Sequence, residues 1–190
     1  MAFYFRPFPT IEYDLKKNKQ TLLLTNLTAR FKIRDELKQR SAIFYEYQVQ
    51  EQDTISNVAF RYYDDETLDW VIMLVNDIID PYYDWPLNYA NFIKYMRTLY
   101  GSVDTAKSTT YEYRKILNSQ KVLFDGTVIP KRTVVIDQNT YNSLAPANRE
   151  EIDAYEYYEE QNNLKRNIKI LDKSYIGLIK TQVETIFTEI

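Results

Sequence analysis

Acidic side chains are the only groups in this sequence that offer a common catalytic or metal-binding arrangement. The chain contains no cysteine and no histidine, so it has no disulfide, no thiol nucleophile, no thiolate zinc site and no imidazole base. Carboxylates gather at two places, Asp64-Asp65-Glu66 and the group Asp77, Asp80 and Asp84. If the chain did chemistry, a pair of these carboxylates would have to carry it.

Both acidic groups have simpler structural roles. The first precedes a helical pattern, where short acidic side chains cap free amides and suit the helix dipole. The second lacks the glycine and the spacing of a calcium-binding loop. With only 3 glycines in the chain, no phosphate-binding glycine loop is present either. We therefore predict no catalytic residue, no metal, no cofactor and no enzyme activity.

Tyrosine is the residue that the composition singles out, with 18 copies in the chain. It offers a large, stiff contact area with a polar tip and is favoured at protein interfaces. Tyr82, Tyr83 and Trp85 form the most interesting group of polar aromatic residues. They are interpreted either as an anchor cluster for a protein partner or as side chains that seal the base of a small core.

The last residues carry a second candidate interface. Five apolar residues recur at spacings of three and four, as the core positions of a heptad do: Ile176, Ile179, Val183, Ile186 and Ile190. The pattern predicts a C-terminal helix with one narrow apolar stripe. Two partners remain possible for it, the chain's own helix expected over residues 146–166, or a neighbouring protein.

The stretch from residue 43 to residue 79 predicts the elements around which the chain is organised. Apolar and polar residues alternate from Ile43 to Val49, as in a strand. A short helix follows, with Asp53 as its cap and an apolar face of Ile55, Val58, Ala59 and Tyr62.

A second helix is expected from Asp64-Asp65-Glu66 onward. Its apolar positions indicate burial on more than one side: Leu68, Trp70, Val71, Ile72 and Val75. Asn76 is expected to end it in a left-handed turn. Ile78 and Ile79 then form the predicted returning strand, which Asp80-Pro81 ends.

This order of strand, helix, helix and strand resembles a LysM module. The resemblance rests on the strand ending in Val49, the Asp53-Thr54 cap, the Val58-Ala59 helix face and Asn76. Gln52 stands where LysM modules usually have a glycine. Because glycine lets a backbone approach a ligand closely, we expect glycan binding to be lost or weak.

A narrower resemblance covers nearly the whole chain. It rests on three segments in order: Phe8–Tyr13, the run from Trp70 through Asp80-Pro81-Tyr82-Tyr83-Asp84-Trp85, and Glu160–Ile170. These are similar to the LysM-like baseplate wedge subunit, the gene product 53 family, of T-even-like contractile-tailed phages. The resemblance implies a structural virion protein in the tail baseplate, with other baseplate wedge and hub-proximal proteins as partners.

The fold class expected from the whole pattern is α+β, in three parts. Residues 1–41 form an N-terminal arm and docking segment, residues 42–88 the LysM-like module, and residues 89–190 a C-terminal region. The first part contains the apolar Leu22-Leu23-Leu24, a strand at Arg30–Ile33 and a basic stretch up to Arg40. That stretch indicates a solvated face or an acidic protein partner rather than nucleic acid.

In the C-terminal region the sequence predicts a helix capped by Asn88 and stopped by Gly101. A polar linker is expected at residues 102–110, and then a hairpin that turns at Asp125-Gly126. A helix starting near Pro146 and ending near Arg166 follows, with a short strand at residues 168–170 and the last helix after it.

Three functions are compatible with this pattern. The first is a baseplate wedge subunit that joins neighbouring wedge components during tail assembly. The second is a LysM-type peptidoglycan-binding module of a tail or lysis protein, and the third is a hydrolase that uses carboxylates alone. We expect no leader and no membrane-spanning segment, because the sequence shows neither a charged-then-apolar start nor an apolar run of membrane-spanning length, and we therefore expect assembly in the host cytoplasm without membrane contact. The wedge subunit is the interpretation that we adopt.

Overall fold

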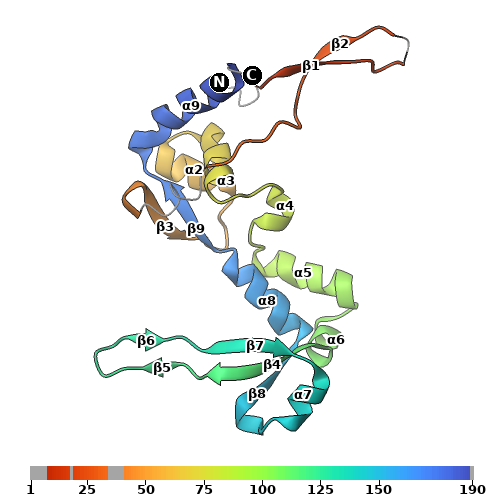
Figure 1. Ribbon diagram of the computed structural model, residues 1–190, viewed down its shortest axis with the longest axis vertical. Helices are drawn as coiled ribbons and strands as arrows, with labels where there is room; N and C mark the ends of the chain where they lie inside the picture. Colours follow the sequence, from red (N-terminus) through yellow and green to blue (C-terminus); the bar gives the residue numbers. More distant parts are fainter. Residues whose placement is uncertain (1–7, 18, 34–40, 189–190) are drawn as a thin grey trace. The chain divides into compact units, whose positions relative to one another are not determined.

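Helices and small antiparallel sheets alternate along the chain, which confirms the predicted α+β class (Figure 1). The computed structural model describes residues 8–17, 19–33 and 41–188. The chain divides into two units, Met1–Pro86 together with Lys165–Ile190, and Leu87–Leu164. This differs from the three expected ranges, because the last strand and helix belong with the beginning of the chain. The chain therefore passes between the units twice.

A two-stranded sheet forms the centre of the first unit. The short 3-10 helix η1 (Ser41–Ile43) leads into β3 (Phe44–Gln48), which pairs antiparallel with β9 (Asn167–Leu171). In this register Tyr47 lies opposite Ile168. The two strands come from opposite ends of the chain, so the first unit is closed only after the second unit has been traversed.

Two helices cover this sheet and form the core with it. They are α2 (Ile55–Tyr63) and α3 (Asp69–Val75), joined by the 3-10 helix η2 (Glu66–Leu68). The predicted apolar faces are confirmed, since the side chains with the least exposure in this core are Val58, Ala59, Val71, Ile72 and Ile170. Tyr63 rather than Tyr62 is buried at the end of α2.

The strand expected at Ile78-Ile79 does not form, and β9 takes its place beside β3. The Asn76 side chain explains why no further strand joins β9 there. Its Nδ2 donates to the Lys169 carbonyl and its Oδ1 accepts from the Lys169 amide, both at 2.8 Å. These two bonds satisfy backbone groups that a neighbouring strand would otherwise bind, so the sheet ends at this point.

Three turns differ in detail from the expectation. Thr54, not Asp53, caps α2, because its Oγ1 accepts from the Asn57 amide at 3.2 Å. Asp64 ends α2 in the left-handed region with φ 58°, while Asp65 caps η2. After α3 the left-handed residue is Asp77, φ 54°, because Asn76 keeps φ at −101° and uses its side chain on β9.

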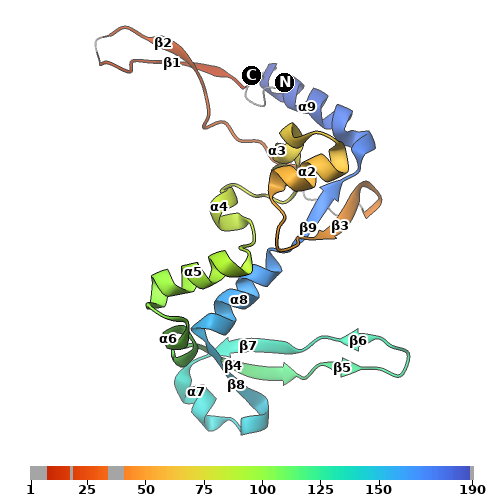
Figure 2. The ribbon, with the colours of Figure 1, turned by 180° about the vertical axis from the view of Figure 1, so that it is seen from behind.

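A hairpin precedes the core and extends away from it (Figure 2). It consists of β1 (Thr10–Tyr13) and β2 (Leu22–Thr25), which pair antiparallel. Phe8 is buried just before it, and Phe31, after it, packs against the same core with the two rings 6.2 Å apart. The strand expected at Arg30–Ile33 does not form. The arm before Phe8 and the basic residues 34–40 lie outside the described residues.

The second unit contains a three-stranded antiparallel sheet in the order β7-β4-β8. Its strands are β4 (Thr110–Asn118), β7 (Arg132–Ile136) and β8 (Arg149–Asp153). The predicted hairpin is confirmed, and the short pair β5 (Lys121–Val122) and β6 (Val128–Ile129) carries it beyond this sheet (Figure 1).

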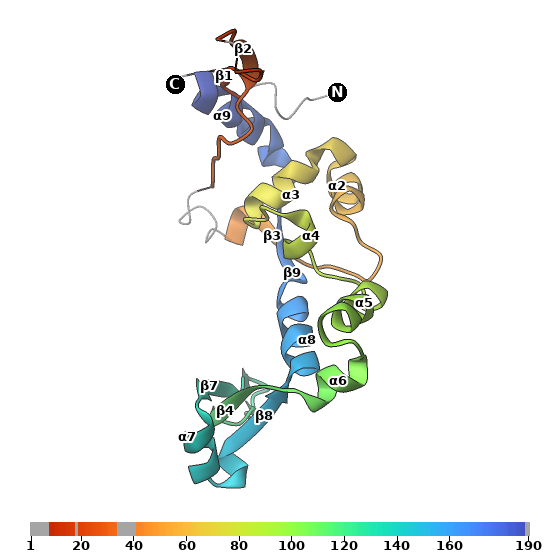
Figure 3. The ribbon, with the colours of Figure 1, turned by 90° about the vertical axis from the view of Figure 1, so that its right-hand side faces the viewer.

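Helices pack beside one another next to this sheet (Figure 3). Helix α5 (Tyr89–Tyr100) starts at Asn88 and ends at Gly101, φ 78°, as predicted. The expected linker is instead helix α6 (Val103–Ser108), because Ser102 caps it with a 3.0 Å bond from the Thr105 amide. Helix α8 (Ala154–Leu164) completes the packing, and its Tyr155 ring lies 5.3 Å from that of Phe92.

The long helix expected over residues 146–166 is shorter and starts later. After α7 (Gln138–Ser143), the 3-10 helix η3 (Pro146–Asn148) leads directly into strand β8. Ile152 is buried between more exposed neighbours, which is the alternation of a strand. Asp153 then starts α8, since its Oδ1 accepts from the Glu156 amide at 2.8 Å. The acidic residues are therefore strand and cap residues rather than a helical first turn.

The chain ends in the 3-10 helix η4 (Lys173–Tyr175) and helix α9 (Ile176–Thr188). Asp172 begins this segment as predicted, by accepting from the Ser174 amide at 2.8 Å. Ile176 and Val183 are buried in the core of the first unit, and Ile179 packs against it. The apolar stripe thus has a partner within the chain, and that partner is the first unit's core rather than a helix over residues 146–166.

We expect Trp70→Ala to lower the free energy of unfolding of the first unit by about 3 to 5 kcal/mol, because Trp70 is buried in α3 and its deletion leaves a cavity. Urea unfolding followed by the fluorescence of Trp85, the other tryptophan of this unit, measures the change. The exposed Tyr82→Ala variant is the control and stays within about 0.5 kcal/mol of the parent. Equal stability of both variants would show that Trp70 is not a core residue.

Candidate protein-interaction surfaces

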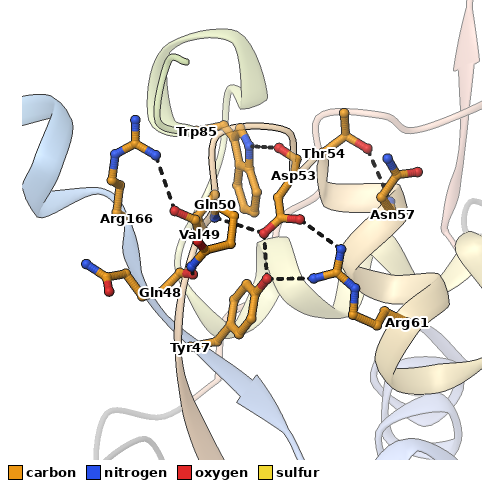
Figure 4. Close-up of polar contacts among 10 residues, drawn as sticks. All are labelled: Tyr47, Gln48, Val49, Gln50, Asp53, Thr54, Asn57, Arg61, Trp85 and Arg166. Atoms are coloured by element: carbon orange, nitrogen blue, oxygen red, sulfur yellow. Dashed lines mark hydrogen bonds and ion pairs between the residues drawn. The ribbon is translucent and has the colours of Figure 1, made fainter. Parts of the chain in front are cut away.

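A polar network holds together the loop between β3 and α2 (Figure 4). The buried Asp53 carboxylate accepts from the Tyr47 hydroxyl at 2.5 Å, from the Gln50 amide at 2.9 Å and from Arg61 Nη2 at 3.0 Å. Arg61 Nη1 also donates to the Tyr47 hydroxyl oxygen at 2.7 Å. Burial raises the pKa of Asp53, but the bonds from Tyr47, Gln50 and Arg61 outweigh it and lower the pKa below its ordinary value. A carboxylate with these bonds already made has a structural role.

Trp85 also stabilises the loop between β3 and α2. Its indole Nε1 donates to the Asp53 carbonyl at 3.1 Å, and its ring packs against the core of the first unit. Arg166 adds a bond from Nη1 to the Val49 carbonyl at 3.2 Å and an ion pair with Glu51. Trp85 is therefore partly buried against the core of the first unit.

Tyr82 and Tyr83 are placed differently from Trp85, on the outside of helix α4 (Pro81–Asp84). With Ile79 they form an exposed surface, since these side chains are 86%, 71% and 73% exposed. Asp84 Oδ2 accepts from the Ile79 and Asp80 amides at 2.9 and 3.0 Å, bonds that lower its pKa, and Asp80 Oδ1 caps α4. These carboxylates shape the turn that displays Tyr82 and Tyr83, which is the structural role expected of them.

Asp64 and Asp65 of the other acidic group also have structural roles. Asp65 Oδ1 accepts from the Thr67 amide at 2.9 Å, and Asp64 is ion-paired with Lys173. In the part of the chain that the structure describes, no three potential metal-binding side chains converge. Likewise, none of the described helices is long and apolar enough to span a bilayer.

The β1–β2 hairpin carries an uncovered apolar surface of the first unit. Every residue of both strands is exposed, although five of the eight are apolar. The apolar residues of the hairpin and its flanks are Ile11, Tyr13, Leu15, Leu22, Leu23, Leu24 and Leu27. Only Leu22-Leu23-Leu24 was identified from the sequence. The alternation of Ile11 and Tyr13, separated from the leucines by a lysine-rich turn, was the signal for the rest.

The second unit displays one aromatic residue at the tip of the β5–β6 hairpin. Phe124 is fully exposed, at 105%. The turn that holds it is closed by bonds from the Gly126 amide to the Leu123 carbonyl at 3.0 Å and from the Leu123 amide to the Thr127 carbonyl at 2.8 Å. Val122 and Val128, opposite each other just below the turn, are also exposed. A preorganised turn that carries an exposed aromatic ring is suited to bind a pocket at low entropic cost.

Phe124 was not predicted from the sequence as a site residue. The sequence signal for it is the apolar pair Leu123-Phe124 beside the predicted Asp125-Gly126 turn, because turn tips are normally polar. The predicted seam of α9 supplies less free surface than expected, since Ile176 and Val183 are buried while Ile186 remains 42% exposed. Ile190 lies outside the described residues.

Comparison with known proteins gives one family. The family model described as base plate wedge protein 53 matches residues 1–186 of the chain. A search of curated proteins gave no match.

Acidic pH should lower the free energy of unfolding of the first unit, because Asp53 becomes protonated. Its pKa in the folded state lies below the ordinary 3.8, so its contribution to stability is present above that value and is lost as the pH falls through the folded-state pKa. We expect Asp53→Asn to remove this part of the acid sensitivity and to lower the free energy of unfolding near neutral pH by about 1 to 3 kcal/mol. Urea unfolding at neutral and acidic pH, followed by tryptophan fluorescence, measures both effects.

The matched control for this variant is Glu46→Gln, on the exposed side of β3. It should leave both the stability and its pH dependence unchanged. An Asp53→Asn variant with the parent's stability at neutral pH would contradict the structural role of the network.

Proposed function

The chain belongs to the base plate wedge protein 53 family, and from this premise we propose that it joins two other components of the wedge, one through each of its units. The family is that of a structural protein of the phage tail baseplate. Joining components requires at least two separate surfaces on one chain. The observation that carries the proposal is that each unit holds an uncovered apolar surface of its own.

In the first unit the surface comprises the β1–β2 hairpin, with the Tyr82-Tyr83 pair as a further exposed aromatic site. In the second unit it is the Phe124 turn. Exposed apolar groups of this size are unfavourable on a free soluble protein and are characteristic of surfaces that become buried in an assembly. Both hairpins are fixed at their bases by packing or sheet pairing, so they present these groups without first having to fold.

The same family places the protein in the virion, and we infer that it enters the baseplate in the host cytoplasm through protein contacts alone. We propose no catalytic role, because the carboxylates of Asp53, Asp65 and Asp80 are engaged in caps and turns. Ile186 on α9 is a further candidate contact residue. Ile176, Ile179 and Val183 act in this proposal by holding α9 to the first unit.

We also propose that β3, α2, α3 and β9 together are the LysM-like module of the chain. The order of strand, helix, helix and strand around one antiparallel pair supports this. In this interpretation the second unit is an insertion between the second helix and the closing strand. The loop that follows β3, which would have to approach a sugar, is occupied by Trp85, the Asp53 network and Arg166.

We therefore expect no saturable binding of the full chain to purified peptidoglycan in a sedimentation assay. A ligand would have to displace the Trp85 indole from the Asp53 carbonyl, and Gln52 takes the place of the glycine that allows close approach. Trp85→Ala serves as a check that the assay reports this loop. Saturable binding that Gln52→Ala abolishes would favour the peptidoglycan-binding alternative.

The connector proposal predicts that the two units lose different partners when their surfaces are changed. Purified full-length chain is mixed with each of the other baseplate wedge proteins of the same phage, and complexes are measured by size-exclusion chromatography with light scattering. Phe124→Ser should remove one complex and leave the other. Tyr82→Ser with Tyr83→Ser should do the reverse, since truncating an aromatic anchor typically costs about 2 kcal/mol or more.

Val135→Thr, an exposed position on β7 away from the turn, is the control for Phe124→Ser and should keep both complexes. The variants keep the parent's circular dichroism because the changed side chains are exposed. Loss of the same complex from both surfaces would contradict a connector with one partner for each unit.

A further inference from the structure

We propose that the β1–β2 hairpin inserts its apolar face into an apolar groove of one other baseplate protein, and that this groove has carboxylates where the lysine-rich turn of the hairpin lies. The inference rests on the proposed function and identifies the chemistry of one of its two partners. It follows from the strand register, the exposure and the charge of the hairpin.

The strand register divides the hairpin into two unlike faces. Directly opposed residues of an antiparallel pair point to the same side, and Ile11 lies opposite Leu24 while Tyr13 lies opposite Leu22. One face is thus entirely apolar. The other face carries Thr10 opposite Thr25 and Glu12 opposite Leu23, so it is mostly polar.

The apolar face has no cover within the described part of the chain. All four of its side chains are exposed, and no third strand joins the hairpin there. A lone two-stranded hairpin is at best marginally stable in water. Phe8 and Phe31 hold this hairpin at its base, and the Asn26 amide donates to the Pro9 carbonyl at 2.8 Å. The hairpin is thereby held away from the core, with its apolar face available to another molecule.

The positive charge of the turn between the strands predicts a negative charge on the partner. Lys16, Lys17 and Lys19 lie within four residues and are exposed, and Lys17 and Lys19 adopt φ 53° and 66°. The nearby Asp14 carboxylate is used within the turn, where its Oδ2 accepts from the Lys19 amide at 2.7 Å. Three ammonium groups at one end of an apolar face are complemented by carboxylates on the partner, which speed encounter and set the direction of insertion.

A second copy of this chain is a poorer occupant than a different protein. Two hairpins packed face to face would bury only four side chains from each copy, on the order of a few hundred Å², whereas a specific interface buries about 1,000 Å² or more. A groove can also contact Leu15, which is exposed near the turn. A groove can therefore cover more of the exposed apolar side chains than a second copy of the hairpin can.

The test uses the full chain and the other purified baseplate wedge proteins of the same phage as probes, with affinities measured by isothermal titration calorimetry. Leu22→Ser with Leu24→Ser should weaken binding of one of these proteins about 50-fold or more, because two apolar side chains no longer leave water. The matched control is Leu23→Ser, which lies between them in β2 but on the other face. It should weaken the same complex by about 3-fold or less.

Charge is tested separately by Lys16→Gln, Lys17→Gln and Lys19→Gln combined. Stopped-flow mixing should show that this variant associates with the same protein about 10-fold more slowly at low salt and that the association rate loses most of its salt dependence. All variants should keep the parent's unfolding transition, since every changed residue is exposed.

Several results would overturn the inference. Leu23→Ser could weaken the complex as much as the double variant does, the lysine variant could keep the parent's salt dependence, or the chain could form dimers that Leu22→Ser with Leu24→Ser disrupts. If two partners still bind and both tolerate the hairpin variants, the connector function stands without this surface. If no baseplate wedge protein binds the parent chain, both proposals fail.

Discussion

The pairing of β3 with β9 is the constraint on which the rest of the structure depends. The two strands meet around Val49 and Arg166, which are 117 residues apart in the chain and are joined by a bond from Arg166 to the Val49 carbonyl. Closing a loop of this length costs conformational entropy, but the cost grows only slowly with length. The buried residues of β9 and α9 join the core of α2 and α3, so burial of apolar side chains compensates for the closure. The second unit is therefore connected to the first at both of its ends, and the surfaces of the two units lie on one covalent chain.

Features that depend on neighbouring residues were predictable from the sequence. The apolar faces of α2 and α3, the cap at Asn88, the stop at Gly101 and the Asp125-Gly126 turn are all present, because each is decided within a few residues. What the local pattern does not encode is which strand closes the sheet. Ile78-Ile79 and Asn167–Leu171 are both short segments with two isoleucines, and it is Asn167–Leu171 that pairs with β3, while the Asn76 side chain binds the edge of β9. The long helix expected after Pro146 was wrong for a related reason, since pairing with β4 makes residues 149–153 a strand.

The candidate surfaces were predictable only in part, because exposure is a property of the folded unit. Tyr82, Tyr83 and Trp85 are adjacent in the sequence, yet the Trp85 indole binds the Asp53 carbonyl inside the unit while both tyrosines face outward. The stripe of α9 was correctly identified as apolar, but its buried residues serve the first unit's own core. Phe124 and the apolar face of β1–β2 became recognisable once the turn and the strand register were known. In each case the residue type was informative and the partner was set by distant parts of the chain.

In the proposed function, one chain contacts two different baseplate proteins through its two units. Cross-linking mass spectrometry of assembled tails with an amine-reactive reagent tests it directly, because lysines occur near both surfaces. The account predicts links from Lys16, Lys17 and Lys19 of the β1–β2 turn to one baseplate protein, and links from Lys121 beside the Phe124 turn to another. Links from both positions to the same protein, or only to other copies of this chain, would contradict it.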